Sequence, residues 1–301
     1  MDKTDFIWMN GKLVKWDDAK IHVLVHALHY GSGVFEGVRF YNTDKGPAVF
    51  RLKEHIARLL KSAKVFEMNV PYSQEQLEKA TLETIAKNKI NAGYIRPIIF
   101  FGYGKMGLNP VGAPVDTVIA VWPWGSYLGE EAVKVKISKY MRIHPKSLVS
   151  DAKVTGHYVN SILASLEAKA AGFEECLLLD FTGNIAEGPG ENLFVVKKKK
   201  LFTPPLGNIL PGITRDSIMK IAKDLGYEIE EKVISVKEAK SADECFFTGT
   251  AAEVTGIKQI DDVTIGNGEV GPITKQLKSA FLDVVKGKNK KYESWLSYAR
   301  K

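Results

Sequence analysis

Strand-forming and helix-forming segments alternate irregularly along this chain of 301 residues, and this order constrains its fold more than any other feature. A strict repetition of one strand and one helix would predict a single parallel sheet. Here hairpins and paired strands interrupt the helices, so the sequence predicts a mixed α/β (α+β) architecture with two domains. We expect a small N-terminal α/β domain at 1–121, an interdomain linker at 122–131, where aromatic residues, glycine and proline gather, and a large C-terminal domain at 132–301.

The first third of the chain predicts a hairpin, two helices and two strands. The hairpin spans 6–16 and turns at Asn10-Gly11. The segment 48–66 predicts the first helix. Its apolar face consists of Leu52, Ile56, Leu59 and Ala63. Ser73 and Gln76 form a capping-box pattern before the second helix at 77–88, and the strands are expected at 93–104 and 116–124.

The second half begins with a predicted strand at 133–141 and a helix at 152–172. A strand at 175–180 leads through a Thr-Gly-Asn turn towards a glutamate-rich bend. The segment 212–226 predicts another helix, which ends at its glycine. Its apolar face consists of Ile218, Ile221, Ala222 and Leu225. Finally, 244–254 predicts a strand that runs into a Thr-Gly-Thr turn.

Charge and composition narrow the function classes. The net charge of +7 favours anionic small molecules, but the basic residues are scattered, so we expect no nucleic-acid partner. The one basic run, Lys197 to Lys200, lies between two apolar stretches and indicates a solvated hairpin turn. No apolar run approaches the roughly 18 residues that span a bilayer, and the first residues lack an apolar signal core. With Cys176 and Cys245 as buried free thiols, we expect a cytoplasmic protein without a membrane partner.

Two segments have features that suit an anion. In "LPGITRDSIMK" a Pro-Gly turn enters a helix whose expected N-cap is Thr214, and a helix start presents free N–H groups. In "FFTGTAAE" a strand delivers Thr248 and Thr250 into a tight bend. Either segment alone is more often an ordinary capped helix or turn.

Lys153 stands just before a helix among small residues, where a desolvated lysine can lose its proton and act as an amine nucleophile. On position alone, a surface lysine is the more common interpretation, and the same holds for Arg58. Tyr158 would ordinarily be a core tyrosine.

The segment "IAEGPGENLFVV" places Glu187 and Glu191 around a Gly-Pro-Gly bend. A metal is not favoured, because no His or Cys lies nearby and the spacing is not that of an EF-hand, so we expect no metal. The glutamates face either water or a cationic ring nitrogen. A lysine amine, a phosphate site and a carboxylate that faces a ring together suggest pyridoxal phosphate.

From Glu187 to Arg215 the sequence closely resembles the signature of the class IV aminotransferases, the fold-type IV pyridoxal-phosphate enzymes (D-amino acid aminotransferase-like). The matching segments are Glu187, Asn192-Leu193-Phe194, Leu201-Phe202-Thr203 and Leu210 to Arg215. Within this family "HALHYGSGVFEGVRFY", "YIRPIIFFGYGKMGLNP", "WPWGSYLG" and "TGTAAEV" resemble the branched-chain amino acid aminotransferases, and the resemblance covers essentially the whole chain. Pro189 departs from it, since the signature usually has a small residue there.

The resemblance implies a role for each matching residue. Lys153 matches the lysine that forms the internal aldimine, Glu187 the carboxylate at the pyridine nitrogen, and Tyr158 the tyrosine at the ring's phenolic oxygen. The implied phosphate site consists of Arg58, Ile213, Thr214 and Thr250. The substrate carboxylate is implied to meet Thr250, Ala251 and Tyr94. The implied side-chain pocket, part of which comes from a neighbouring subunit, consists of Tyr30, Phe35, Gly37, Arg96, Trp124 and Tyr127.

The resemblance therefore implies an aminotransferase that moves the amino group of L-leucine, L-isoleucine or L-valine to 2-oxoglutarate and passes through pyridoxamine phosphate. It also implies at least a homodimer, and hexamers occur in the family. Three alternatives stay open: a D-amino acid aminotransferase, an aminodeoxychorismate lyase, and a non-catalytic binder of a phosphate ligand. The "YIRP" and "FEGVR" segments count against the first, and Arg96 with its aromatic neighbours counts against the second.

Overall fold

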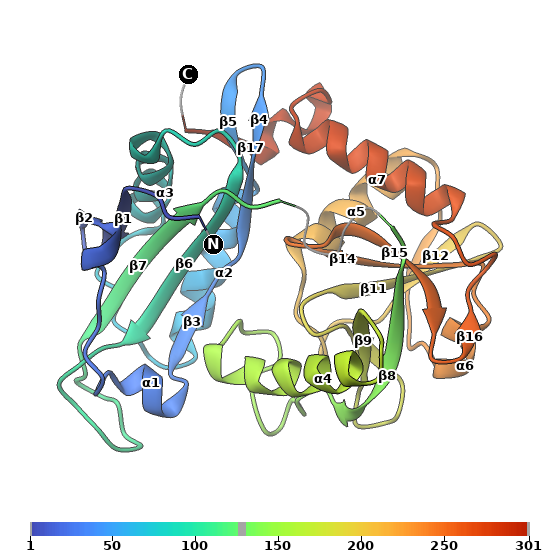
Figure 1. The fold of residues 1–301 in the computed structure, drawn as a ribbon, viewed down its shortest axis with the longest axis horizontal. Coiled ribbons are helices and arrows are strands. Elements are labelled where there is room, and N and C mark those ends of the chain that lie inside the picture. Colours follow the sequence, from blue (N-terminus) through green and yellow to red (C-terminus); the bar gives the residue numbers. More distant parts are fainter. Residues whose placement is uncertain (1, 126–130, 300–301) are drawn as a thin grey trace. The chain divides into compact units, whose positions relative to one another are not determined.

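A computed structural model describes residues 2–125 and 131–299 of the chain. These residues form two compact units, each with its own sheet and helices, so the mixed α/β fold class is confirmed (Figure 1). Unit 1 comprises Met1–Gly125, Ala152–Gly156 and Asp283–Lys301, and unit 2 comprises Ser126–Asp151 and His157–Leu282. This division departs from the single boundary expected at 122–131, because the chain returns to unit 1 twice; residues 126–130 of the expected linker lie outside the described residues.

The sheet of unit 1 has the strand order β17–β5–β4–β6–β7–β1–β2, and β3 pairs with β6. Every pairing in this sheet is antiparallel within the described residues. The strands are β1 (Phe6–Met9), β2 (Lys12–Lys15), β3 (Gly33–Phe35), β4 (Val38–Thr43), β5 (Gly46–Phe50), β6 (Gly93–Phe101), β7 (Val115–Trp122) and β17 (Leu296–Tyr298). The predicted hairpin is confirmed, with Asn10 and Gly11 at positive φ in its turn. The pairing of β17 with β5 brings the C-terminal segment into unit 1.

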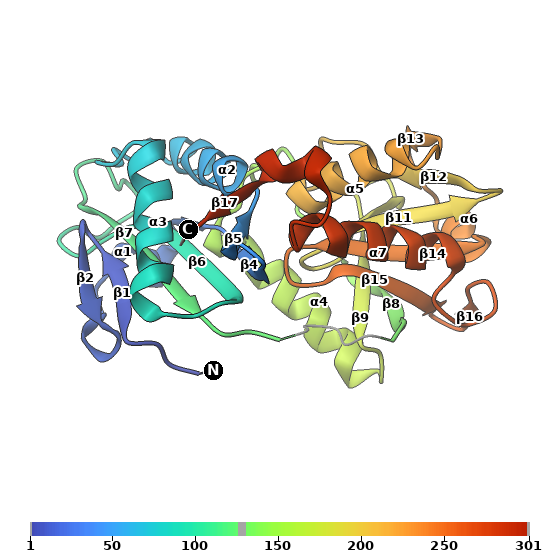
Figure 2. The ribbon, with the colours of Figure 1, turned by 90° about the horizontal axis from the view of Figure 1, so that it is seen from above.

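Helices α2 (Leu52–Lys64) and α3 (Gln74–Asn88) pack against each other and against this sheet (Figure 2), whereas the short α1 (His26–Tyr30) contacts β6. The predicted apolar face of α2 is confirmed, since Leu52, Ile56, Leu59 and Ala63 are all buried. The prediction that this helix begins at residue 48 is wrong, because 48–50 belong to β5 and pair with β4 and β17. The capping box before α3 is also confirmed, because Ser73 accepts from the Gln76 N–H and the Gln76 side chain accepts from the Ser73 N–H. The core of unit 1 therefore lies between these two helices and the sheet.

The sheet of unit 2 has the order β10–β9–β8–β15–β14–β11–β12–β13, and β16 pairs with β15. Strand β8 runs parallel to β9 and β15, and β12 runs parallel to β13. The strands are β8 (Val133–Met141), β9 (Glu175–Leu179), β10 (Ile185–Glu187), β11 (Asn192–Lys197), β12 (Lys200–Thr203), β13 (Ile229–Glu231), β14 (Glu244–Gly249), β15 (Glu253–Ile260) and β16 (Val263–Thr264). The predicted turn between β11 and β12 is confirmed, with Lys198 and Lys199 at positive φ.

Helix α4 (Tyr158–Ala170) packs on β8 and β9, and α5 (Ile213–Asp224) packs on β14 and β13. The other helices that begin in unit 2 are α6 (Val236–Lys240) and α7 (Pro272–Val285). The prediction of a helix throughout 152–172 is wrong at its start, because Val154 forms a β-bridge with Val34 and only the residues after a short 3-10 turn become α-helical.

Two details of α5 correct the sequence prediction. Gly212, with an extended backbone, is the N-cap, so Thr214 lies inside the first turn instead of capping it. Leu225 is 40% exposed and does not share the apolar face, because the helix ends at Asp224. Ile218, Ile221 and Ala222 are buried as predicted.

Both cysteines lie in the interior of unit 2. Cys176 and Cys245 are free and buried, as predicted, and burial raises the pKa of each thiol above its ordinary range. Within residues 2–125 and 131–299, no helix has both the length and the apolar character that crossing a membrane requires.

The packing of α2 leads to a first prediction. Leu59 has no exposed surface, so Leu59→Ala leaves a cavity and should lower the free energy of unfolding by about 2–5 kcal/mol. Val65, which follows the same helix, is 40% exposed, and Val65→Ala is expected to cost less than about 1 kcal/mol. Urea denaturation of both variants tests this, and equal losses would contradict the packing described for α2.

Candidate active site

Lys153 lies in the five-residue segment that returns to unit 1. Its carbonyl accepts from the Phe35 N–H at 3.0 Å, and its own N–H donates to Ser62 Oγ at 3.0 Å. The next residue, Val154, forms the β-bridge to Val34. These contacts fix the backbone of Lys153 against β3 and α2, and its ammonium nitrogen lies 5.1 Å from the centre of the Phe35 ring.

The same aromatic ring also faces Arg96. The guanidinium carbon of Arg96 lies 4.8 Å from the centre of the Phe35 ring and 5.5 Å from that of Tyr94. Gly37 lies beside Tyr94, and a Cβ on it would come within 1.9 Å of the tyrosine hydroxyl oxygen. Glycine is therefore required at position 37 for the hydroxyl of Tyr94 to occupy this place. The structure thus brings these five predicted residues of unit 1 together.

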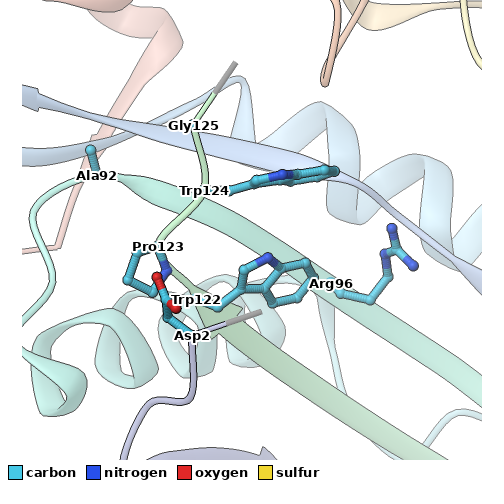
Figure 3. Close-up of a pocket in the computed structure, with 7 residues that line it drawn as sticks. All are labelled: Asp2, Ala92, Arg96, Trp122, Pro123, Trp124 and Gly125. Atoms are coloured by element: carbon cyan, nitrogen blue, oxygen red, sulfur yellow. The ribbon is translucent and has the colours of Figure 1, made fainter. Parts of the chain in front are cut away.

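A pocket of about 750 Å³ opens beside this group (Figure 3). It is lined by Asp2, Ala92, Arg96, Trp122, Pro123, Trp124 and Gly125. The Trp124 ring packs edge-on against Tyr94 with centroids 4.3 Å apart. The Nε of Arg96 is buried and has no hydrogen-bond partner among the described residues. A cation that lies between aromatic rings beside an open pocket suits both an apolar group and a carboxylate.

Arg58 belongs to a buried charged cluster that the sequence did not predict. Its Nε and Nη2 donate to the two oxygens of Glu36 at 2.6 and 2.9 Å, and His55 Nδ1 lies 2.7 Å from the same carboxylate. Burial alone would raise the pKa of Glu36, but the charge of Arg58 and the contacts with His55 and Arg58 together outweigh it and hold the pKa well below its ordinary value. Burial lowers the pKa of His55, and the charges of Arg58 and Lys153 add to this effect. His55 is therefore a neutral donor to an ionised Glu36.

Glu187 ends β10 in unit 2, after a break in the pairing register with β9. It is 6% exposed, and both of its oxygens are bonded. Arg142 Nε donates to Oε1 at 2.5 Å, Asn192 Nδ2 donates to Oε2 at 3.0 Å, and the Leu210 N–H reaches Oε2 at 3.1 Å. A buried carboxylate with such donors around it stays ionised, so this residue provides a fixed negative charge inside unit 2.

Asn192 connects Glu187 to the start of α5. Besides its bond to Glu187, its Nδ2 donates to the Leu210 carbonyl at 3.0 Å. A Cβ on Gly212 would lie 1.9 Å from Asn192 Oδ1, so only glycine allows this close approach at the N-cap of α5. Ile213 and Thr214 follow in the first turn, and both are buried. Their N–H groups belong to the helix start, where they have no partner within the helix.

The bend after Glu187 lies against the turn that follows β14. Asn192 pairs with Thr248 in the ladder between β11 and β14, so the end of β14, followed by Thr250 and Ala251, lies next to the bend. Glu191 is 5% exposed, and its Oε2 accepts from the Gly190 N–H at 3.0 Å. The carbonyl of Pro189 accepts from Ser161 Oγ on α4 at 2.8 Å, which ties the bend to that helix.

The remaining predicted residues take separate places. Tyr158 is the first residue of α4 and is half-buried, and Tyr30 ends α1 with 43% of its surface exposed. Tyr127 lies outside the described residues. In each unit the structure therefore groups most of the residues that the sequence assigned to the site.

Four polar residues of these groups received no role from the sequence: Glu36, His55, Arg142 and Asn192. Asn192 could have been found, because it stands in the signature and begins an apolar strand. The other three gave no local signal, since their partners are distant in sequence.

The site residues can now be compared with known proteins. The chain matches the family model of the amino-transferase class IV over residues 33–260. It is 46% identical to the branched-chain-amino-acid aminotransferase of Escherichia coli (strain K12), over 98% of this chain and 97% of that protein. It is similar to the solved T.th. branched-chain amino acid aminotransferase complexed with N-(5'-phosphopyridoxyl)-L-glutamate, with 46% identity, full coverage of both chains and a TM-score of 0.97. The Thermobaculum terrenum enzyme in its PLP-form is 32% identical, with full coverage of both chains and a TM-score of 0.93.

The neutral state of buried His55 makes stability depend on pH. Its pKa in the folded chain lies below its value in the unfolded chain, so below about pH 6.5 the unfolded chain binds the additional proton. The free energy of unfolding should therefore fall as the pH decreases from about 6.5 to about 5.5, by at most about 1.4 kcal/mol per pH unit.

His55→Asn, which keeps a side-chain N–H for Glu36, should reduce this slope. His29 is exposed, so His29→Asn should keep the slope of the unchanged protein. Urea denaturation at several pH values measures the slopes, and an unchanged slope in His55→Asn would show that folding does not lower the pKa of His55.

Proposed function

The chain belongs to the class IV family of amino-transferases, and on this premise we propose that it is a branched-chain amino acid aminotransferase. It transfers the amino group of L-leucine, L-isoleucine or L-valine to 2-oxoglutarate. Its cofactor is pyridoxal 5'-phosphate, with which relatives have been solved in pyridoxal, pyridoxamine and phosphopyridoxyl forms. The observation that carries the proposal for substrates is the position of Arg96 between the rings of Phe35 and Tyr94.

The two half-reactions place opposite demands on one pocket. A branched apolar side chain needs an apolar wall, which Trp122 and Trp124 supply in the pocket and Phe35 supplies beside Arg96. The second carboxylate of glutamate needs a cation, which Arg96 supplies with an Nε that has no partner in the described chain. We assign substrate binding to these residues together with Tyr30, Gly37, Tyr94, Tyr127, Thr250 and Ala251.

The donor set of the chain fits the cofactor. An ionised, buried Glu187 suits a protonated ring nitrogen, and the start of α5 at Gly212, which has no side-chain cap, presents N–H groups that suit an anion. We assign the phosphate to Arg58, a cation whose guanidinium is held in place by Glu36, with Ile213, Thr214 and Thr250. We assign the hydroxyl of Tyr158 to the phenolic oxygen of the ring.

When bound, pyridoxal phosphate supplies an aldehyde carbon for the substrate amine and a ring that accepts electrons from the Cα–H bond. Lys153 would hold the cofactor through its Nζ. During the reaction, the amine of Lys153 would remove the Cα proton as a general base and deliver it, as a general acid, to the former aldehyde carbon. Arg96 and the aromatic wall orient the substrate so that this proton faces Lys153. Release of the 2-oxo acid before 2-oxoglutarate enters makes the kinetics ping-pong.

The test of this function is spectroscopic and kinetic. The protein loaded with pyridoxal phosphate should absorb visible light, and L-leucine without an acceptor should abolish this band, whereas D-alanine should not. Lys153→Ala should lose the band and lower turnover by at least about 10²-fold. Lys146→Ala, which removes an exposed lysine, should behave like the unchanged protein. Bleaching by D-alanine alone would favour the D-specific alternative, and pyruvate release without an acceptor would favour the lyase.

We also propose that the protein is at least a homodimer and that it is cytoplasmic. Support for the dimer comes from α4, where Val159, Ile162, Leu163 and Leu166 lie at the spacing of one helix face and are 41–60% exposed. Such a continuous apolar face is unusual on a monomer and suits a second copy of this chain. The two buried free thiols are compatible with a reducing compartment.

A charge on this face tests the dimer. Ile162→Glu should weaken self-association by about 100-fold, because the carboxylate would be buried without a partner. Lys223→Glu, which places a carboxylate on an exposed polar position of α5, should leave the assembly intact. Light scattering across a dilution series measures both variants. If both variants form dimers with the same affinity, the interface lies elsewhere.

A further inference from the structure

Arg142 is a buried cation that the function assigned above does not use. It directly follows β8, and its side chain is only 9% exposed. Its backbone N–H donates to the Leu179 carbonyl at 2.7 Å, and this bond fixes the backbone of Arg142 beside the end of β9. Its Nε donates to Glu187 Oε1 at 2.5 Å. A guanidinium keeps its charge at any ordinary pH, so Arg142 is a permanent positive charge behind this carboxylate.

The partners of Glu187 have two different effects on it: some orient its carboxylate, and one places a charge beside it. Asn192 and the Leu210 N–H bond mainly to Oε2 and orient the carboxylate, but both are neutral. Arg142, by contrast, brings a full positive charge to Oε1. If a neutral N–H donor replaced Arg142, the orientation of the Glu187 carboxylate would be kept. The electrostatic effect of the positive charge on that carboxylate would be lost.

We propose that Arg142 is a positioning residue that keeps the proton shared between Glu187 and the ring nitrogen on the nitrogen. This inference rests on the role proposed for Glu187. A proton that moves from the ring to Glu187 brings positive charge closer to Arg142, because the guanidinium contacts the carboxylate directly. Coulomb repulsion therefore opposes this transfer. A protonated ring nitrogen is the form that withdraws electrons from the substrate, so Arg142 supports the reaction without contact with it.

The ¹⁵N resonance of ring-labelled pyridoxal phosphate bound to the protein measures where this proton lies. In the unchanged protein the resonance should indicate a protonated nitrogen throughout about pH 6–9. Arg142→Gln keeps an N–H for Glu187 but removes the charge, and its resonance should shift towards the bare nitrogen. Its kcat with L-leucine should fall by about 10- to 100-fold, the size typical of partners that tune a functional group, while the KM stays nearly constant.

Arg142→Lys keeps a charge that can titrate when buried. Its resonance should indicate a protonated nitrogen at about pH 6 and shift towards the bare nitrogen as the pH rises to about 10, which tests the proposal even if Arg142→Gln does not fold. Resonances that match the unchanged protein in Arg142→Gln, or in Arg142→Lys at every pH, would overturn the proposal for Arg142. A bare nitrogen in the unchanged protein, or a protonated one in Glu187→Gln, would instead overturn the role of Glu187.

Discussion

Each unit of this protein buries a carboxylate almost completely, and the polar residues around the candidate site follow from that constraint. Glu36 has no exposed surface and Glu187 is 6% exposed. A buried carboxylate without partners costs several kcal/mol, which is a large part of the stability of a whole domain. Glu36 is therefore bonded to Arg58 and His55, and Glu187 to Arg142, Asn192 and a backbone N–H. These partners fix the side chains to which we assign the phosphate and the ring nitrogen.

The same constraint determines where glycine is needed. Asn192 reaches both Glu187 and the Leu210 carbonyl, and this is possible only because Gly212 leaves room for its Oδ1. In unit 1, Gly37 leaves room for the hydroxyl of Tyr94, which in turn flanks Arg96. In both places a missing side chain allows a polar atom to approach the backbone. A methyl group at either position would displace a polar atom of the site.

Local sequence patterns predicted the features that depend on contacts between residues close together in the chain. The capping box at Ser73, the apolar face of α2 and the turn at Asn10-Gly11 are confirmed, because each involves residues within a few positions of one another. The start of α4 and the N-cap of α5 were wrong, since a β-bridge from Val154 and the extended backbone of Gly212 override local helix preference. Arg142 could not be found, because it reaches Glu187 only through the parallel pairing of β8 with β9. The roles implied for Lys153 and Glu187 came from the family resemblance and stay predictions.

The return of Ala152–Gly156 to unit 1 explains why a lysine with no local signal has a fixed position. The residues on both sides of this segment belong to unit 2, yet its backbone bonds to Gly31, Phe35 and Ser62. Lys153 is thus anchored to the same strand that carries Phe35, and Phe35 also faces Arg96. A shift of β3 would move the amine and the wall of the substrate pocket together. A proton transfer that depends on the distance between a base and a bound substrate benefits from such common anchoring, since both partners of the reaction are positioned by one rigid strand.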